Sequence, residues 1–106
     1  MEIEKVAVLG AGQMGAGIAQ VSACAGYDVV MIDISEEFLE RGMRTISSSL
    51  EKLVSKGRMS EKDSSSAMSR ISSSTDRASA SEADLVVEAI PEIPDLKFST
   101  FSELDS

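Results

Sequence analysis

The stretch KVAVLGAGQMGAGIAQ, residues 5–20, constrains the fold of this 106-residue chain more than any other part of the sequence. Its first residues, 5–9, are apolar and rich in valine, which predicts a buried strand. A helical apolar period then runs over 13–25, and a second apolar strand is expected at 28–32. A strand, a crossover helix and a second strand at this spacing predict a right-handed βαβ unit in a parallel sheet. The fold class is therefore α/β.

Three glycines between the first strand and the first helix stand at G-x-G-x-x-G spacing. In this context Gly10 is expected to make the tight turn, and Gly12 to let a pyrophosphate approach the main chain. Gly15 is expected to let the helix pack closely on the strand. Backbone N–H groups at the start of the helix, together with its dipole, attract an anion. We therefore expect the whole loop to bind a dinucleotide: Gly10, Ala11, Gly12, Gln13, Met14 and Gly15.

Asp33 follows the second expected strand, 21 residues after Gly12. Its carboxylate can accept hydrogen bonds from the adenosine ribose of a coenzyme, and it would repel a 2′-phosphate. Ile34 and Ser35 bring no positive charge for that phosphate. The sequence therefore predicts NAD rather than NADP as the coenzyme, bound by a Rossmann-type doubly wound parallel sheet.

The remaining elements are predicted from caps and apolar periods. Ser35 is expected to cap a long helix that ends near residues 56–57, and Ser60 to cap a shorter one. Short strands are expected at 72–75 and 85–90, then a turn between Pro91 and Pro94 and a helix over the last dozen residues. The long helix should direct its apolar residues inward: Leu39, Met43, Ile46, Leu50 and Leu53.

The first helix carries two stripes of non-polar residues. Larger ones (Met14, Ile18, Val21 and Ala25) fall on one stripe, and small ones (Gly15, Ala19, Ser22 and Gly26) on the other. Cys24, the single cysteine, is expected to be a small buried thiol. With no histidine in the chain, it lacks the partner that activates a catalytic cysteine, and we expect no metal site.

The net charge of −8 argues against binding nucleic acid through its phosphates. Between Arg41 and Lys62, however, basic residues outnumber acidic ones by six to two. Such a segment is either a solvated helix face or a surface kept for an anion. No apolar run reaches membrane-spanning length and the start does not read as a signal peptide, so we expect a cytoplasmic protein without a membrane partner.

Three segments together resemble the N-terminal part of the 3-hydroxyacyl-CoA dehydrogenases, including bacterial and archaeal 3-hydroxybutyryl-CoA dehydrogenases. They are KVAVLGAGQMGAGIAQ, GYDVVMIDISEE and ADLVVEAIPE, and the resemblance covers nearly the whole chain. It implies oxidation of the 3-hydroxyl of an acyl-CoA thioester to a ketone with NAD, a step of fatty-acid β-oxidation. The parent protein is then expected to be a homodimer formed through a C-terminal helical domain.

Position by position, the resemblance makes the glycine loop the pyrophosphate site and Asp33 the ribose contact. It also places Glu92 and Lys97 near the coenzyme, and Ser49 and Lys56 at the coenzyme A part of the acyl-CoA substrate. Ser49 and Lys56 are seven residues apart and share a helix face, which agrees with the basic segment. A cationic face suits the phosphates of coenzyme A.

The family's catalytic histidine and its neighbours lie beyond the segment that this chain spans. We therefore assign no catalytic residue, and we expect 1–106 to be a truncated NAD-binding Rossmann domain that binds the coenzyme without turnover. Two alternatives remain open. One is a 3-hydroxyisobutyrate or 6-phosphogluconate type of dehydrogenase, whose loop also has a Met-Gly step although Asp33 argues against it. The other is a non-catalytic nucleotide-binding module.

Overall fold

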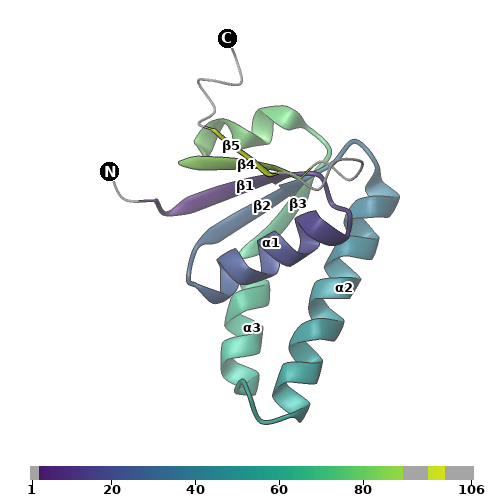
Figure 1. The fold of residues 1–106 in the computed structure, drawn as a ribbon, viewed down its shortest axis with the longest axis vertical. Helices are drawn as coiled ribbons and strands as arrows, with labels where there is room; N and C mark the ends of the chain where they lie inside the picture. The colour runs from purple at the N-terminus through teal and green to yellow at the C-terminus, as the bar shows by residue number, and fades with distance from the viewer. Residues whose placement is uncertain (1–2, 90–95, 100–106) are drawn as a thin grey trace.

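The computed structural model of the chain describes residues 3–89 and 96–99. Strands and helices alternate along most of the sequence (Figure 1). In chain order the elements are β1 (Lys5–Leu9), α1 (Gln13–Cys24), β2 (Asp28–Ile32), α2 (Glu36–Ser55), α3 (Glu61–Ser69), β3 (Ile71–Ser74), the 3₁₀ helix η1 (Arg77–Glu82), β4 (Leu85–Ala89) and β5 (Leu96–Ser99).

The strands form one sheet in the order β3-β2-β1-β4-β5, in which the first four are parallel. This confirms the predicted α/β fold with a parallel Rossmann-type sheet. Because sequential strands lie on either side of β1, the strand order reverses there, at the point where such sheets bind ligands.

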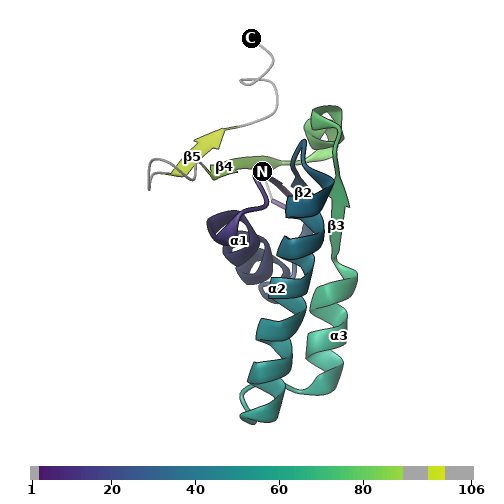
Figure 2. The same ribbon diagram turned by 90° about the vertical axis from the view of Figure 1, so that its right-hand side faces the viewer.

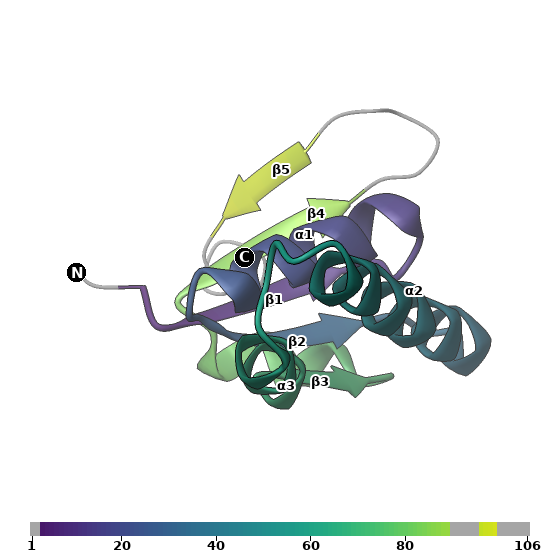
Figure 3. The same ribbon diagram turned by 90° about the horizontal axis from the view of Figure 1, so that it is seen from below.

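The prediction of a helix over the last dozen residues is wrong for 96–99. These residues form β5, which pairs antiparallel with β4 at the edge of the sheet (Figure 3). Their sequence, LKFS, alternates apolar and polar residues, as a strand does. The open edge of β4 supplies the hydrogen-bond partners that turn this short segment into a strand. The rest of that prediction, and the turn between Pro91 and Pro94, lie outside the described residues.

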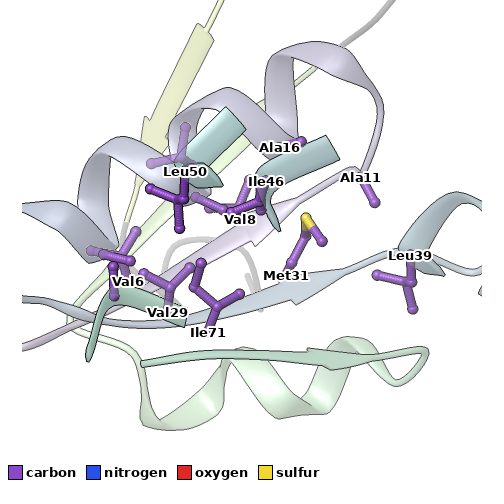
Figure 4. Packing of buried hydrophobic residues seen from close by; sticks show 14 residues of the cluster. Val6, Val8, Ala11, Ala16, Val29, Met31, Leu39, Ile46, Leu50 and Ile71 are labelled. Atoms are coloured by element: carbon purple, nitrogen blue, oxygen red, sulfur yellow. The ribbon is translucent and has the colours of Figure 1, made fainter. Parts of the chain in front are cut away.

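Alternate residues of the central strands point to opposite faces of the sheet. Figure 2 shows α1 on one side of β4 and η1 on the other. Val6 and Val8 of β1 and Met31 of β2 are buried in the cluster that packs against α1, α2 and α3 (Figure 4). Ala7 and Val30 point to the other face, where η1 covers them with Ala80. The larger cluster lies on the helix face, and that cluster fixes α1 and α2 relative to the sheet.

Helix α1 turns its small-residue stripe to the sheet. Gly15 and Ala19 of that stripe are buried, together with Ala16 and Ala23, although Gly26 at its end is exposed. Val21 of the larger stripe is 69% exposed. The prediction that Cys24 is buried is wrong, because its side chain is exposed and Ala23, one residue earlier, takes the buried position. Successive helical residues are about 100° apart, so a shift of one residue moves a side chain off the packed face.

Helices α2 and α3 extend beyond the sheet as an antiparallel pair (Figure 1). The hydroxyl of Ser35 accepts a hydrogen bond from the backbone N–H of Phe38, and that of Ser60 accepts one from Asp63. Both predicted N-caps are confirmed. The predicted inward residues of α2 are buried or half-buried: Leu39, Met43, Ile46, Leu50 and Leu53.

Candidate dinucleotide site

The glycine loop lies across the carboxyl ends of the two strands beside β1. The backbone N–H of Gly10 donates to the carbonyl oxygen of Ile32 at 2.7 Å, which ties the loop to the end of β2. Gly10 has φ = +108°, and a Cβ there would lie 2.8 Å from the carbonyl oxygen of Ala89 in β4. Only glycine adopts this conformation without strain, so the sequence requires it at this turn.

The two other glycines of the motif have opposite surroundings. A Cβ on Gly15 would overlap the carbonyl oxygen of Gly10, so Gly15 permits the close approach of α1 to the turn. A Cβ on Gly12 would meet nothing within 4 Å, so the main chain there faces open space. Gly12 is also the N-cap of α1, where no side chain accepts a hydrogen bond and the first turn holds no acidic residue.

The start of α1 therefore has free N–H groups and the positive end of the helix dipole, next to open space. This is the arrangement that binds phosphate anions in dinucleotide folds. A pocket of about 1070 Å³ lies over it. The pocket is lined by the predicted loop, Gly10 to Gly15, and by Asp33. The residues present thus fit the pyrophosphate of a dinucleotide.

Sequence reasoning missed part of the pocket wall. The additional lining residues are Ala16, Phe38, Arg41, Gly42, Thr45 and Ala89. Four of these lie on α2 at spacings of three and four residues, the spacing of one helix face. That periodicity was the available signal. It was hidden because this face mixes aromatic, charged and small residues, of which only Gly42 is buried, unlike the apolar stripe of the same helix.

Asp33 links the end of β2 to the glycine loop. Its Oδ2 accepts a hydrogen bond from the backbone N–H of Ala11, and its Oδ1 accepts one from Ser35, each at 2.9 Å. A carboxylate offers about four lone-pair sites. Both oxygens therefore keep acceptor capacity for ribose hydroxyls, and the backbone bonds fix their direction.

Arg41 is held by two neighbours on α2. Its Nη2 donates to Oε1 of Glu37 at 2.8 Å, and its guanidinium lies over the ring of Phe38, 5.6 Å from the centroid. Arg41 and Glu37 are largely exposed, so the ion pair contributes little to the stability of the fold. The pair restricts instead where the guanidinium lies on the pocket wall.

A second, basic groove follows the same helix. It has a volume of about 450 Å³ and is lined by Arg41, Arg44, Thr45, Ser48, Ser49 and Lys52. Arg41 and Thr45 line both this groove and the larger pocket, so the two cavities adjoin. Predicted residue Ser49 lies in the groove, where its Oγ accepts a hydrogen bond from Nε2 of Gln20 at 3.0 Å. Predicted residue Lys56 is the C-cap of α2 and does not line the groove.

The two remaining predicted site residues are Glu92 and Lys97. Lys97 lies in β5, opposite Glu88 of β4 in the antiparallel register. Glu92 lies outside the described residues. Their predicted place near the coenzyme stays a prediction.

No three side chains of histidine, cysteine, aspartate or glutamate gather as metal ligands within 3–89 and 96–99. Among the helices of that part, none combines the length and the apolar character that crossing a bilayer requires.

Known proteins resemble this chain in sequence and in fold. The 3-hydroxybutyryl-CoA dehydrogenase of Bradyrhizobium diazoefficiens is 44% identical over 102 residues, which are 96% of this chain and 35% of that protein. The glyoxysomal fatty acid beta-oxidation multifunctional protein MFP-a of Brassica napus is 36% identical over 98% of this chain and 14% of its own length.

The crystal structure of (S)-3-hydroxybutyryl-CoA dehydrogenase from Ralstonia eutropha superimposes with a TM-score of 0.83 at 42% identity. The superposition covers 87% of this chain and 32% of that one. The chain spans about a third of the length of the 3-hydroxybutyryl-CoA dehydrogenases that it matches. The sequence profile of the 3-hydroxyacyl-CoA dehydrogenase NAD-binding domain matches residues 5–106. Because that match covers nearly the whole chain, the chain belongs to the family of NAD-binding domains of 3-hydroxyacyl-CoA dehydrogenases, and its coenzyme is NAD.

Proposed function

We propose that this chain is the coenzyme-binding part of an enzyme that oxidises (S)-3-hydroxyacyl-CoA to 3-oxoacyl-CoA in fatty-acid metabolism. The observation that carries the proposal is the shared pocket: the open start of α1 and the oriented carboxylate of Asp33 lie in one cavity, which adjoins a basic groove. When bound, NAD accepts the hydride.

In this proposal the loop from Gly10 to Gly15 holds the pyrophosphate through its backbone N–H groups, and Asp33 accepts hydrogen bonds from the adenosine ribose. Glu92 and Lys97 lie close to the coenzyme. These assignments rest on the family resemblance for Glu92 and Lys97, and on the pocket geometry for the loop and Asp33.

The acyl-CoA substrate is proposed to lie along the basic groove, with its phosphates near Ser49 and Lys56. The groove is lined by three cations, Arg41, Arg44 and Lys52. They support this placement, because phosphates form charge-assisted hydrogen bonds with such side chains. Gln20 donates to the Oγ of Ser49 and so leaves the hydroxyl proton of Ser49 free to donate to a ligand.

The chain contains no histidine. A histidine base, as the family uses, must therefore come from outside these 106 residues, and we expect the chain alone to bind NAD and acyl-CoA without turnover. A cytoplasmic location and a homodimeric parent enzyme are also proposed, from the family resemblance.

Titration of the chain with NADH, followed by coenzyme fluorescence, tests the proposal. We expect NADH to bind and NADPH to bind at least about tenfold more weakly, because two like charges about 4 Å apart near a protein surface repel by more than the ~1.4 kcal/mol that a tenfold change requires. Adding acetoacetyl-CoA should then change the dissociation constant of NADH, since the two cavities adjoin.

Other outcomes support the alternatives. A preference for NADPH would favour a dehydrogenase of the 3-hydroxyisobutyrate or 6-phosphogluconate type. NADH binding without any effect of acetoacetyl-CoA would favour a nucleotide-binding module. Absence of NADH binding contradicts the proposal outright.

A further inference from the structure

We propose that the ion pair between Glu37 and Arg41 is a second determinant of the choice between NADH and NADPH, beside Asp33. Glu37 holds a guanidinium that would otherwise be available to a 2′-phosphate. This inference rests on the proposed function, because it concerns the adenosine end of the same pocket. It adds Glu37 and Arg41 to the residues that determine the choice of coenzyme. Neither belongs to the glycine motif, and neither is the acidic residue that follows β2.

Arg41 lies where a guanidinium can reach a 2′-phosphate on the coenzyme. Arg41 and Asp33 line the same pocket, and Arg41 is the single cation among the lining residues in the described part of the chain. Arginine binds phosphate through two parallel hydrogen bonds, which makes it the usual partner of a 2′-phosphate. The pocket therefore already contains the group that an NADPH-binding site needs.

The neighbours of Arg41 carry the second step. Its Nη2 is 2.8 Å from Oε1 of Glu37, and its guanidinium lies over the ring of Phe38. These contacts occupy one donor nitrogen and a face of the planar group. A 2′-phosphate that bonds to Nη2 would compete with Glu37 for it, and it would also meet the negative charge of that carboxylate.

The backbone between Asp33 and α2 carries the third step. Ser35 donates its N–H to Asp33 and accepts the N–H of Phe38 with its hydroxyl, so one residue orients the carboxylate and caps the helix. The distance from Asp33 to the first two turns of α2 is thereby fixed. Substituting Glu37 should release Arg41 without moving this frame.

The strength of the pair decides how large the effect is. The side chains of Arg41 and Glu37 are 61% and 72% exposed, and exposed pairs are worth about 0.2–1 kcal/mol. Loss of the pair itself therefore accounts for at most about a fivefold change in affinity. Removing the repulsion between Glu37 and the phosphate increases the affinity for NADPH further. Asp33 still opposes the 2′-phosphate more strongly than Glu37 does.

The test measures the ratio of the dissociation constants of NADPH and NADH by coenzyme fluorescence. The variants are E37Q, D33N, D33N/E37Q and D33N/E37Q/R41M. The matched control is E40Q, alone and with D33N. Glu40 is an exposed acid on the same helix that lines a different cavity, with Leu39, Met43, Arg44 and Ser73. E40Q changes the net charge by the same amount as E37Q, but outside the coenzyme pocket.

We expect E37Q to lower the ratio about threefold, and D33N/E37Q to lower it about tenfold relative to D33N. Adding R41M to D33N/E37Q should raise the ratio back to that of D33N. E40Q should change the ratio by less than about twofold, alone and with D33N. Equal ratios for D33N/E37Q and D33N/E40Q, or a gain that persists in the R41M variant, would overturn the inference while the proposed function stands. Failure of the unsubstituted chain to bind NADH would overturn both.

Discussion

The carboxylate of Asp33 accepts the backbone N–H of Ala11 at 2.9 Å, although 22 residues separate them in the sequence. Its other oxygen accepts the N–H of Ser35. One side chain thus joins the end of β2 to the glycine loop and to the start of α2. The residue proposed to bind the ribose also holds the loop proposed to bind the pyrophosphate, so its two roles can be separated only by comparing variants.

We expect D33A to lower both coenzyme affinity and stability. It leaves the N–H groups of Ala11 and Ser35 without their acceptor, which costs about 1–3 kcal/mol of unfolding free energy, and it raises the dissociation constant of NADH at least about tenfold. D33N keeps one acceptor oxygen and should lose less stability. Urea unfolding and NADH titration measure the two effects.

Asp28 provides the matched control for this substitution. It lies at the other end of β2, with an exposed side chain, about 16 Å along the strand from Asp33. D28A should change neither measurement appreciably. If D28A lost as much stability and NADH affinity as D33A, the loss of one negative charge, rather than the loss of the contacts of Asp33, would explain both effects.

The prediction for the glycines rests on their different surroundings in one helix. We expect G15A to destabilise the chain by more than about 2 kcal/mol, because the new Cβ overlaps the carbonyl oxygen of Gly10 and the turn must move. G17A, two residues on, should stabilise it by about 0.5–1 kcal/mol, because its Cβ meets nothing within 4 Å. Urea unfolding of both variants checks this, and equal effects would contradict it.

The sequence was sufficient for the parallel strands and the glycine turn, because apolar runs, helical period and glycine spacing are local signals. It was not sufficient for α1, where Cys24 was expected to be buried and is exposed. Which stripe faces the sheet depends on how closely α1 approaches the turn at Gly10. That distance is a property of the assembled layers and not of the helix.

The residues of the site also divide into those predicted by spacing along the chain and those brought together only by folding. Gly10 to Gly15 and Asp33 could be predicted because their spacing along the chain is characteristic. Phe38 and Arg41 could not, because their face of α2 becomes a pocket wall only when the helix packs beside the loop. Likewise β5 depends on pairing with β4, which a tetrapeptide sequence does not specify.

The basic groove makes a prediction about coenzyme A. We expect K52A to weaken the binding of coenzyme A about three- to tenfold, because a charge-assisted contact to phosphate is lost. K62A is the control, since Lys62 belongs to the same basic segment but does not line the groove. Calorimetric titration at two salt concentrations measures both. Equal losses would show that only the overall charge of the segment matters.

Asp84 makes the stability of the sheet depend on pH. Its Oδ2 accepts the backbone N–H groups of Glu4 and Lys5, at 2.9 and 3.1 Å, which holds the start of β1 beside the start of β4. These hydrogen bonds lower the pKa of Asp84 below its ordinary value of 3.8. Because the folded-state pKa is the lower one, Asp84 stabilises the fold above its ordinary pKa, and this contribution is lost as the pH falls through the folded value.

The comparison that isolates this effect is between the unsubstituted chain and D84N, which cannot titrate at this position. We expect the difference in their urea midpoints to be constant from about pH 7 to pH 5 and to shrink progressively below about pH 4, as the carboxylate is protonated. A difference that persists unchanged to about pH 2 would mean that the backbone contacts of Asp84 do not depend on its charge.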